Sequence, residues 1–463
     1  MRKALPSKAG LFLLNLLLPA PRFQYTVAMK KVLLIGNGAR EHVIAETLHK
    51  FGATVFCYGK ARNPGILQLA EDYEIGSLED FPHLQEYAKK IQPDFAFIGP
   101  DDPIGNGMAD ILLELKIRSV APLKTVARLE SSKSFTRALL KKFSIPGNPR
   151  FQVFYNLEGV EGFLRELGEN YVVKADGLMG GKGVKVSGDH LHSHAEALAF
   201  AKECLEGGGR VVIEEKFVGQ EFSLMSFVDG VHTSEMPVVQ DHKRAFEGDK
   251  GPNTGGMGSY SDTNHLLPFL RPQDLDEARE ITQRVAQALK EETGTLFQGI
   301  MYGGFIATAN GVRLIEYNAR FGDPEVLNVL PILKTNFVDV CEAVMDGTLD
   351  QLKVEFENKA TVCKYLVPEG YPDRPQKGRP ITVGEIPAGV RTYYSSVDQT
   401  AEGLLLSSSR AIAFVGVDDS IAAAEKLAES ACHSVTGPVF YRKDIGTEKL
   451  IGQRVAMMKQ LRS

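Results

Sequence analysis

Short apolar runs alternate with longer amphipathic segments in the first part of the chain. Residues 31–35, 53–58 and 95–98 are strongly apolar, and a helical pattern covers 39–50. Strands that alternate with helices predict a parallel, doubly wound sheet. Ligands of such sheets bind outside the carboxyl ends of the strands, so we expect a ligand site at the loops that follow these strands.

A second unit is predicted from residue 128 to about residue 352, and a smaller α/β unit from 353 to 463. Between two of its predicted strands, residues 240–258 are polar and glycine-rich and predict one long loop, of the kind that is usually functional or disordered. The remaining pattern predicts strands at 151–154, 171–174, 184–187, 210–213, 300–308, 312–317, 361–367 and 411–417, and helices at 131–142, 157–167, 192–205, 272–292 and 420–433.

The first glycine-bearing loop, Gly36-Asn37-Gly38, opens a helix and is typical of an anion site. It does not fit a dinucleotide-binding loop, because Glu41 stands where that motif has its third glycine. The second strand also ends at Tyr58 without an acid to hold a ribose hydroxyl. We expect a phosphate-bearing small substrate here, and a plain structural turn is the alternative.

A second glycine-rich loop follows a strand that ends at Lys174. Its glycines let backbone amides turn toward an anion. No Gly-Lys-Ser or Gly-Lys-Thr opens a helix, so it is not a Walker A loop; it returns into a strand and predicts a flap over phosphates. The loop residues in question are Gly177, Gly180, Gly181, Lys182 and Gly183.

The segment Leu314–Glu325 is the centre of the predicted site. Glu316 and Asn318 are two residues apart on a strand, so their side chains leave the same face. A carboxylate and an amide oxygen on one rigid face suit Mg²⁺, which takes its other ligands from water and nucleotide phosphates. The alternative is a strand end with a polar turn, but the upstream lysine and glycine loop favour a metal-bound triphosphate.

Composition narrows the class of partner. The chain has 463 residues, enough for about three domains, and a formal net charge of −5, which gives no case for nucleic acid or an anionic membrane. Its five cysteines are scattered without a Cys-x-x-Cys motif. This pattern fits a reducing compartment and argues against a zinc site or a disulfide framework.

Residues 1–29 differ from the rest. Basic residues precede the apolar run 11–18, as in a signal peptide, and the run is too short to span a bilayer. Met29 is followed at once by Lys30, Lys31 and a buried-type strand. We favour an upstream start codon or a disposable extension over a targeting segment, and expect a cytoplasmic protein.

Taken in order, the motifs closely resemble those of the phosphoribosylamine–glycine ligase family, also called glycinamide ribonucleotide synthetases, which are ATP-grasp enzymes. The resemblance covers roughly Lys30 to Gly446. It is carried by KVLLIGNGAREH, IGPDDP, VVKADGLMGGKGV, VVIEEKFVGQEFS, QDHKRAFEGDKGPNTGGMGSY, LIEYNARFGDPE and YRKDIG.

The resemblance implies an α/β fold with three domains after the extension 1–29. These are an N-terminal doubly wound sheet of the pre-ATP-grasp type at 30–127, a two-lobed ATP-grasp domain at 128–352 and a small C-terminal α/β domain at 353–463. The flap lobe of the ATP-grasp domain would span about 150–216.

The resemblance also implies the reaction: glycine, 5-phosphoribosylamine and ATP give glycinamide ribonucleotide, ADP and phosphate through glycyl phosphate, in purine synthesis. Mg²⁺ or Mn²⁺ would be the cofactor, and the protein would be a monomer or homodimer. Phosphoryl transfer needs positioning and charge neutralisation more than a protein nucleophile. An acyl phosphate also needs protection from water, which a hinged flap supplies.

Site residues follow from the resemblance by position. It implies catalytic roles for Arg320, Lys174 and Asp323, and metal binding by Glu316 and Asn318. It implies ATP binding by Lys133, Lys174, Gly177, Gly180, Gly181, Lys182, Gly183, Glu214, Glu215, Phe217 and Glu221; for Glu215 a charged strand end is the alternative. It implies substrate binding by Gly36, Asn37, Gly38, Asp101, Asp241, His242, Lys243, Arg244, Gly255, Gly256, Met257 and Gly258.

The sequence departs from the family pattern at a few positions. Asp101 stands where a glutamate is usual, and its shorter side chain is expected to weaken a ribose contact. Ala39 and Arg62 replace glycines, and Lys216 takes a usually apolar place.

Two other functions compete with this ligase. One is an ATP-grasp carboxylate–amine ligase with a different amine or acid, for which the departures at Ala39, Arg62 and Asp101 would be the sign. The other is a nucleotide-binding regulator without catalysis, which the presence of Lys174 and Glu316 disfavours.

Overall fold

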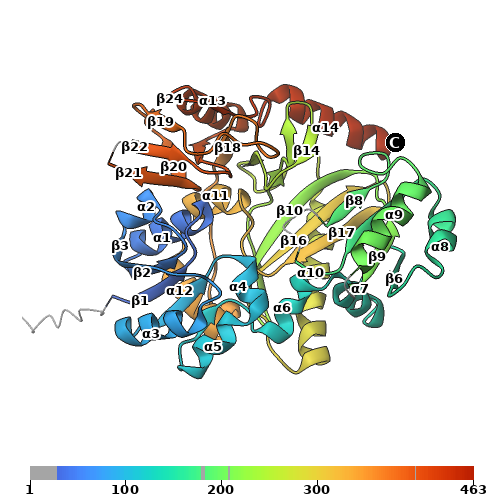
Figure 1. Ribbon diagram of the computed structural model, residues 1–463, viewed down its shortest axis with the longest axis horizontal. Coiled ribbons are helices and arrows are strands. Elements are labelled where there is room, and N and C mark those ends of the chain that lie inside the picture. The colour runs from blue at the N-terminus through green and yellow to red at the C-terminus, as the bar shows by residue number, and fades with distance from the viewer. Residues whose placement is uncertain (1–28, 179–182, 207–208, 402) are drawn as a thin grey trace, which may run out of the picture.

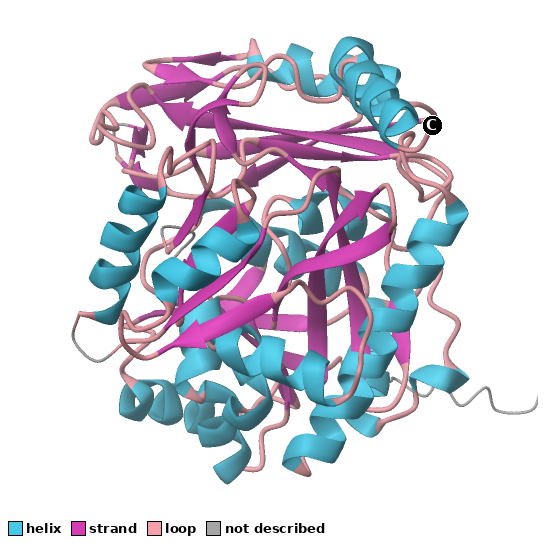
Figure 2. Ribbon diagram, turned by 90° about the vertical axis from the view of Figure 1, so that its right-hand side faces the viewer, coloured by secondary structure: helices cyan, strands magenta, loops and turns pink. Residues whose placement is uncertain are grey.

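The computed structural model describes residues 29–178, 183–206, 209–401 and 403–463 (Figure 1). Several β-sheets occupy the interior and most helices lie toward the outside (Figure 2). Within the described ranges, no helix combines the length and the apolar character needed to cross a bilayer.

The N-terminal part forms a parallel five-stranded sheet with the order β3-β2-β1-β4-β5. This confirms the predicted doubly wound sheet. Its strand β3 was not predicted, because AEDYEI at the sheet edge is half-exposed and carries three acids. The strands are β1 (Lys31–Ile35), β2 (Thr54–Gly59), β3 (Ala70–Ile75), β4 (Phe95–Ile98) and β5 (Ser119–Val120), and the helices are α1 (Ala39–Lys50), α2 (Pro64–Leu67), α3 (Phe81–Ile91), α4 (Asp101–Asn106) and α5 (Met108–Glu114).

A first antiparallel sheet of the central region has the order β6-β9-β7-β8. Val173 and Ile213 of this sheet pack in one apolar cluster with Leu164 and Ala197 of two covering helices. The hairpin between its last two strands contains the glycine-rich loop. The elements are β6 (Phe151–Phe154), β7 (Tyr171–Ala175), β8 (Val184–Val186), β9 (Val211–Glu215), α8 (Val160–Leu167) and α9 (His194–Leu205).

A second antiparallel sheet has the order β11-β10-β16-β17 and carries the metal-site candidates. Side chains alternate along its long strand β16: Met301 and Phe305 share an apolar cluster with helix α10, whereas Ile300 and Tyr302 share another with helix α12. The elements are β10 (Gln220–Asp229), β11 (Thr233–Glu235), β16 (Gln298–Thr308), β17 (Gly311–Asn318), α6 (Lys124–Ser131), α7 (Lys133–Lys142), α10 (Pro272–Thr293), α11 (Glu325–Val329), α12 (Phe337–Asp346) and the 3₁₀ turns Leu330–Ile332 and Leu349–Gln351.

The C-terminal part contains a larger sheet in the order β12-β15-β18-β23-β20, with β25 also on β18, and a smaller sheet in the order β21-β22-β19-β24. Strands β12 (Gln240–Asp241) and β15 (Gly258–Ser261) of the larger sheet come from the central region. Helix α13 packs on β18 and β23. The elements are β18 (Ala360–Pro368), β19 (Pro380–Val383), β20 (Val390–Tyr394), β21 (Val397–Thr400), β22 (Gly403–Leu406), β23 (Ile412–Asp418), β24 (Val435–Thr436), β25 (Val439–Phe440), α13 (Ile421–Cys432) and α14 (Glu448–Leu461).

The prediction of one long loop at 240–258 is wrong. The segment forms β12 (Gln240–Asp241), the hairpin strands β13 (Arg244–Phe246) and β14 (Lys250–Asn253), and the start of β15 (Gly258–Ser261). β15 pairs with β12 and with β18, about 100 residues further along the chain. The pairing partner is remote, so the local polar and glycine-rich pattern gives no sign of it. The C-terminal sheet therefore extends directly to the segment that carries Lys243 and Gly255.

Candidate active site

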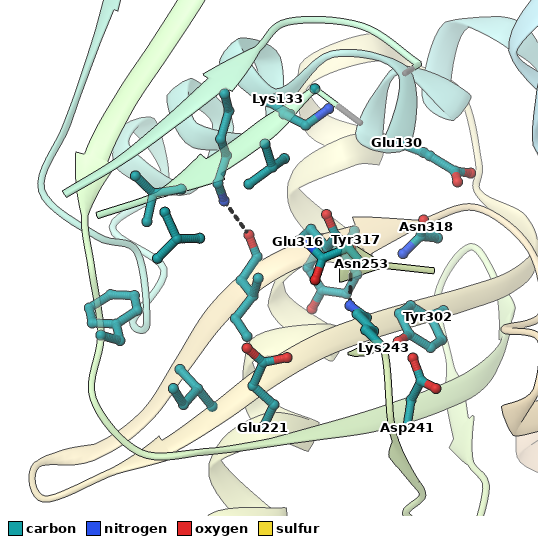
Figure 3. A pocket seen from close by; sticks show the side chains of 18 of the residues that line it. Glu130, Lys133, Glu221, Asp241, Lys243, Asn253, Tyr302, Glu316, Tyr317 and Asn318 are labelled. Carbon is teal, nitrogen blue, oxygen red and sulfur yellow. Dashed lines mark hydrogen bonds and ion pairs between the residues drawn. The ribbon is translucent and has the colours of Figure 1, made fainter. Parts of the chain in front are cut away.

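One cleft of about 600 Å³ lies between the two antiparallel sheets and also reaches the N-terminal and C-terminal parts. Figure 3 shows side chains from several elements converging on it. The sequence-predicted residues that line it are Asp101, Lys133, Lys174, Gly177, Gly183, Glu214, Glu215, Phe217, Glu221, Asp241, Lys243, Arg244, Gly255, Glu316, Asn318, Arg320 and Asp323.

Glu316 and Asn318 project from the same face of β17 into this cleft, as the strand period requires (Figure 3). Lys243 Nζ lies 3.8 Å from Glu316 Oε1. Burial opposes the charge on Glu316, but Lys243, Lys174 and nearby cations lower its pKa below the ordinary value. Glu316 is therefore an anion at neutral pH.

This pair fits a divalent metal bound together with a nucleotide. Asn318 Oδ1 accepts a hydrogen bond from Arg320 Nη2 at 3.1 Å, which orients the amide oxygen. Across the described ranges, no group of three or more His, Cys, Asp or Glu side chains has the arrangement of a complete metal site. A hard cation at Glu316 and Asn318 would take its other ligands from water and phosphate oxygens.

The side of the cleft that the sequence predicts to bind the nucleotide is built around a buried ion network. Arg137 of α7 donates from Nε to Glu214 Oε2 at 2.7 Å and from Nη2 to Glu214 Oε1 at 3.0 Å. Lys174 pairs with the same carboxylate and donates to the Ile315 carbonyl at 3.2 Å. Burial would raise the pKa of Glu214, but Arg137 and Lys174 lower it. The Glu214 carboxylate therefore holds Lys174 in place, and Arg137, which the sequence did not single out, holds Glu214.

The base of the flap is anchored to the start of α7. Lys133 Nζ donates to the Gly177 carbonyl at 2.8 Å, and Ser134 donates to Asp176. The Ala175 N–H donates to the Gly183 carbonyl at 2.8 Å, which closes the hairpin. The predicted residues Gly180, Gly181 and Lys182 lie outside the described residues.

The connection from β9 to β10 forms one wall of the nucleotide side. Glu215 accepts hydrogen bonds from the Arg150 N–H at 2.9 Å and from Arg150 Nε at 3.3 Å. Phe217 lines the cleft, and the exposed carboxylate of Glu221 lies in it close to Lys243 (Figure 3). The side chain of Glu215 is thus paired as a charged strand end, while Lys216, Phe217 and Gly219 of the connection line the cleft.

The other half of the cleft contains a cluster of acids around one lysine. Tyr302 donates to Glu325 Oε1 at 2.7 Å and lies 2.9 Å from the Ser223 hydroxyl. Burial, and after it Glu325, raises the pKa of Asp241 well above its ordinary value. Burial would lower the pKa of Lys243, but the surrounding acidic groups raise it well above the ordinary value. Lys243 is therefore a permanent cation.

Arg320 connects this half to the N-terminal sheet. It lies 3.4 Å from Glu130 of α6, and Arg40 of α1 donates to the Phe321 carbonyl at 3.3 Å. Burial would raise the pKa of Asp101, but Arg320 and Arg40 lower it. Asp101 is thus an ionised carboxylate at the edge of the cleft nearest the predicted anion turn.

The loop Gly36-Asn37-Gly38, which the sequence predicts as an anion site, is held in shape by the side chain of Glu41. The Gly38 N–H donates to Glu41 Oε2 at 2.6 Å, so this side chain folds back over the loop. A Cβ atom at Gly36 would lie 2.7 Å from Glu41 Cδ, and the φ of Gly36 is +115°. The third-glycine position is therefore filled by a carboxylate that caps the helix, which is incompatible with close approach of a pyrophosphate.

Some predicted substrate residues lie outside the lining of the cleft. The His242 ring is buried, and burial, and after it Arg442, lowers its pKa to about 3. Met257 packs in the apolar core. The predicted substrate residues of the described ranges that do not line the cleft are Gly36, Asn37, Gly38, His242, Gly256, Met257 and Gly258.

Two antiparallel sheets with the cleft between them are the arrangement of an ATP-grasp ligase, a class that uses ATP with a divalent metal. Family models agree with this class. The chain matches the N domain of phosphoribosylglycinamide synthetase over residues 30–130, its ATP-grasp (A) domain over 131–326 and its C domain over 361–448. The chain belongs to the phosphoribosylglycinamide synthetase family, as the motifs predict.

Individual proteins give the same result. The phosphoribosylamine–glycine ligase of Methanosarcina barkeri is 48% identical over 434 residues, which cover 93% of this chain and all of that protein. The enzyme of the same name from Methanocaldococcus jannaschii is 47% identical over 443 residues, with 93% and 100% covered. The crystal structure of phosphoribosylamine–glycine ligase from Thermotoga maritima has a TM-score of 0.76 at 29% identity and covers 89% of this chain and 99% of that one. A biotin carboxylase domain from Hydrogenobacter thermophilus, at 16% identity and a TM-score of 0.67, shares the fold; the match covers 93% of this chain and 94% of that one.

Proposed function

We propose that this chain joins glycine to 5-phosphoribosylamine with ATP and yields glycinamide ribonucleotide, ADP and phosphate in purine biosynthesis. The observation that carries the proposal is Glu316, an ionised carboxylate beside Asn318 that faces Lys243 across the cleft between flap and acid cluster. Relatives that are 46–48% identical over 93% of the chain bear the name of this ligase, which supports the choice of substrates.

The first step is phosphoryl transfer to the carboxylate of glycine. Lys133 and Lys174, which line the cleft together with Gly177 and Gly183, would contact the ATP phosphates. Backbone at 214–218 would bind adenine, and Glu221 the ribose. Glu316 and Asn318 would hold Mg²⁺ or Mn²⁺, which supplies charge neutralisation at the phosphates when bound. Arg320 would steady the transferring group, because a fixed guanidinium matches developing charge on phosphate oxygens.

The second step is attack of the ribosylamine nitrogen on the carbonyl of glycyl phosphate, with phosphate as the leaving group. Lys243 would hold the anionic end of glycine during the first step, because it is a cation that lines the cleft, 3.8 Å from the Glu316 carboxylate. Asp101 lines the cleft, and its carboxylate would accept a hydrogen bond from a ribose hydroxyl of phosphoribosylamine at this edge. The Asp323 loop and Gly255 would form the wall that keeps water from the acyl phosphate.

The proposal extends to organisation. We assign residues 30–127 to a substrate domain, 128–352 to the ATP-grasp domain, with its flap lobe at about 150–216, and 353–463 to the C-terminal domain. Arg442 and β12–β15 connect the last two closely. The protein would act in the cytoplasm as a monomer or homodimer.

The proposal is tested by phosphate release from the purified protein with ATP, Mg²⁺ and glycine. Phosphoribosylamine is made in situ from ribose 5-phosphate and ammonia and is either added or omitted. We expect continuous release only when both co-substrates are present. Equal release with a different acid or amine favours another carboxylate–amine ligase. ATP binding without any release contradicts catalysis.

A further inference from the structure

We propose that Arg410, in the turn before β23 of the C-terminal sheet, is a positioning residue for the ligation step. It would keep the substrate wall of the cleft closed around the acyl phosphate until the amine attacks. The substrate wall is defined here as Thr254–Gly256 together with Asp323 and Pro324. This inference rests on the proposed function, because it concerns the fate of glycyl phosphate.

The guanidinium of Arg410 joins the two halves of the substrate wall. Its Nη1 lies 2.7 Å from the Gly255 carbonyl, 3.1 Å from the Gly256 carbonyl and 3.1 Å from the Asp323 carbonyl. Its Nη2 lies 3.1 Å from Asp323 Oδ2. One side chain thus contacts backbone on both loops and a carboxylate on one of them.

The aromatic ring of Tyr365 packs against the guanidinium of Arg410. Arg410 Cζ lies 4.4 Å from the centre of the ring, and the Tyr365 hydroxyl donates to Asp323 Oδ1 at 2.7 Å. The two Asp323 oxygens therefore have one partner each, Arg410 and Tyr365. A planar guanidinium makes several such contacts at once, whereas the ammonium of lysine is a point charge on a flexible stem.

The substrate wall is closely packed around Gly256, and its Arg410–Asp323 pair is largely buried. The φ of Gly256 is +105°, and a Cβ there would lie 2.5 Å from Pro324 Cδ and 2.6 Å from Asp241 Oδ1. The side chain of Arg410 is only 12% exposed and that of Asp323 13%, so the pair is largely screened from water. Removing the cation leaves a poorly solvated carboxylate on the wall, which drives the Asp323 loop to rearrange toward solvent.

Arg410 acts on one side of the cleft only. Thr254, Gly255 and Asp323 line the cleft, whereas Arg410 lies behind them and does not. Within the part of the chain that the structure describes, Arg410 contacts Gly255, Gly256 and Asp323, and it makes no hydrogen bond or ion pair to Lys133, Lys174 or the β9–β10 connection. Loss of Arg410 is therefore expected to spare nucleotide binding and to open the acyl-phosphate end.

If the substrate wall opens, glycyl phosphate is expected to be hydrolysed in addition to being transferred to the amine. Water that reaches glycyl phosphate attacks its carbonyl carbon; the bond from that carbon to the bridging oxygen breaks, phosphate leaves and a proton passes to solvent. The net result is ATP hydrolysis with glycine regenerated. The ratio of phosphate released to glycinamide ribonucleotide formed then rises above one. A change that only lowers the amount of folded enzyme reduces both products equally and leaves this ratio unchanged.

The test compares the full-length wild type with Arg410→Met, Arg410→Lys and Tyr365→Phe at saturating substrates. Phosphate and glycinamide ribonucleotide are measured in the same samples, and ADP affinity is measured by calorimetry. We expect a ratio of one for the wild type, a rise of at least about twofold for Arg410→Met and smaller rises for the other two variants. ADP affinity is expected to change by less than about twofold.

Arg391→Met is the matched control. Arg391 belongs to β20 of the same sheet, is 55% exposed and forms a 3.7 Å ion pair with Glu46 of α1. The Arg391→Met variant loses the same charge as Arg410→Met and is expected to keep a ratio of phosphate to glycinamide ribonucleotide of one. If Arg410→Met does not fold, the ratios of Arg410→Lys and Tyr365→Phe decide. A ratio of one in every folded variant overturns the inference, whereas a wild type that forms no glycinamide ribonucleotide overturns the proposed function instead.

Discussion

Glu316 is the residue at which the metal, the nucleotide phosphates and Lys243 would meet. Its charge is maintained by cations that come from four separate segments, Lys243, Lys174, Lys133 and Arg320. Asn318 has the neighbouring position on the same strand face and accepts from Arg320. The role of each of these residues therefore depends on the others, and a change at Glu316 is expected to affect the metal first.

Glu316→Gln keeps the size of the side chain and removes its charge. We expect turnover to fall at least about 100-fold, because metal-assisted charge stabilisation is worth several kcal/mol. The Mg²⁺ concentration for half-maximal activity is expected to rise as well. Steady-state kinetics over a Mg²⁺ titration measure both quantities. Glu280→Gln, an exposed change on α10, is the control. Near-normal turnover at ordinary Mg²⁺ would refute the metal assignment.

At the scale of elements, the β13–β14 hairpin is held from outside by the C-terminal segment. Arg442 is 1% exposed and donates to the Arg244 carbonyl at 3.1 Å, to Asp249 at 2.9 Å and to Asp444 at 2.7 Å. Arg454 of α14 pairs with the same Asp249. This network ties the hairpin that carries Arg244 and Asn253, two residues of the cleft, to the turn before α14.

Arg442→Met removes the shared cation from two carboxylates. We expect the free energy of unfolding to fall by about 3 kcal/mol, because Asp444 loses its cation in a mostly buried pair while Asp249 keeps Arg454. Urea denaturation followed by circular dichroism measures it. Arg391→Met, in which an exposed ion pair is lost, is expected to cost under about 1 kcal/mol. Equal losses in the two variants would show that the Arg442 network contributes no more than a surface pair.

Some elements and contacts can be predicted from the local sequence pattern, and others cannot. Strands such as β1 and β4 are continuous apolar runs that the local pattern predicts, and strand period predicts that Glu316 and Asn318 share a face. Their metal role is inferred from the upstream lysine and glycine loop and stays a prediction. β15 depends on pairing with β18, and Arg137 and Arg410 depend on partners more than 75 residues away. These contacts are set by tertiary packing, which no window of local sequence contains.

At the scale of the whole molecule, His42 connects the N-terminal and C-terminal parts. The Tyr394 N–H donates to His42 Nδ1 at 3.0 Å, and the Tyr394 ring is stacked on the imidazole. A Cβ at Gly65 would lie 1.8 Å from the ring, so α2 packs directly on it. Burial lowers the pKa of His42 to about 4 from an ordinary 6.5. The interface therefore requires the neutral imidazole.

This interface predicts a pH dependence of stability. Between pH 6.5 and 4 the unfolded chain binds a proton at His42 that the folded chain does not, so stability is lost as pH falls through this window. Across the whole window the free energy of unfolding is expected to fall by roughly 3 kcal/mol. His42→Gln is expected to be less stable than the wild type at pH 7, with a difference that shrinks toward pH 4. Urea denaturation at several pH values measures it, and a constant difference would contradict the buried neutral histidine.

The central claim is that glycine is activated as an acyl phosphate and then transferred to the ribosylamine nitrogen. The most direct measurement uses glycine with both carboxylate oxygens replaced by ¹⁸O, together with ATP, Mg²⁺ and phosphoribosylamine. Mass spectrometry then gives the isotopic composition of the phosphate. The bridging oxygen of glycyl phosphate comes from glycine, so each phosphate is expected to carry one ¹⁸O atom and each glycinamide ribonucleotide the other. Phosphate without ¹⁸O, formed alongside the product, would contradict the acyl phosphate and the role given to this site.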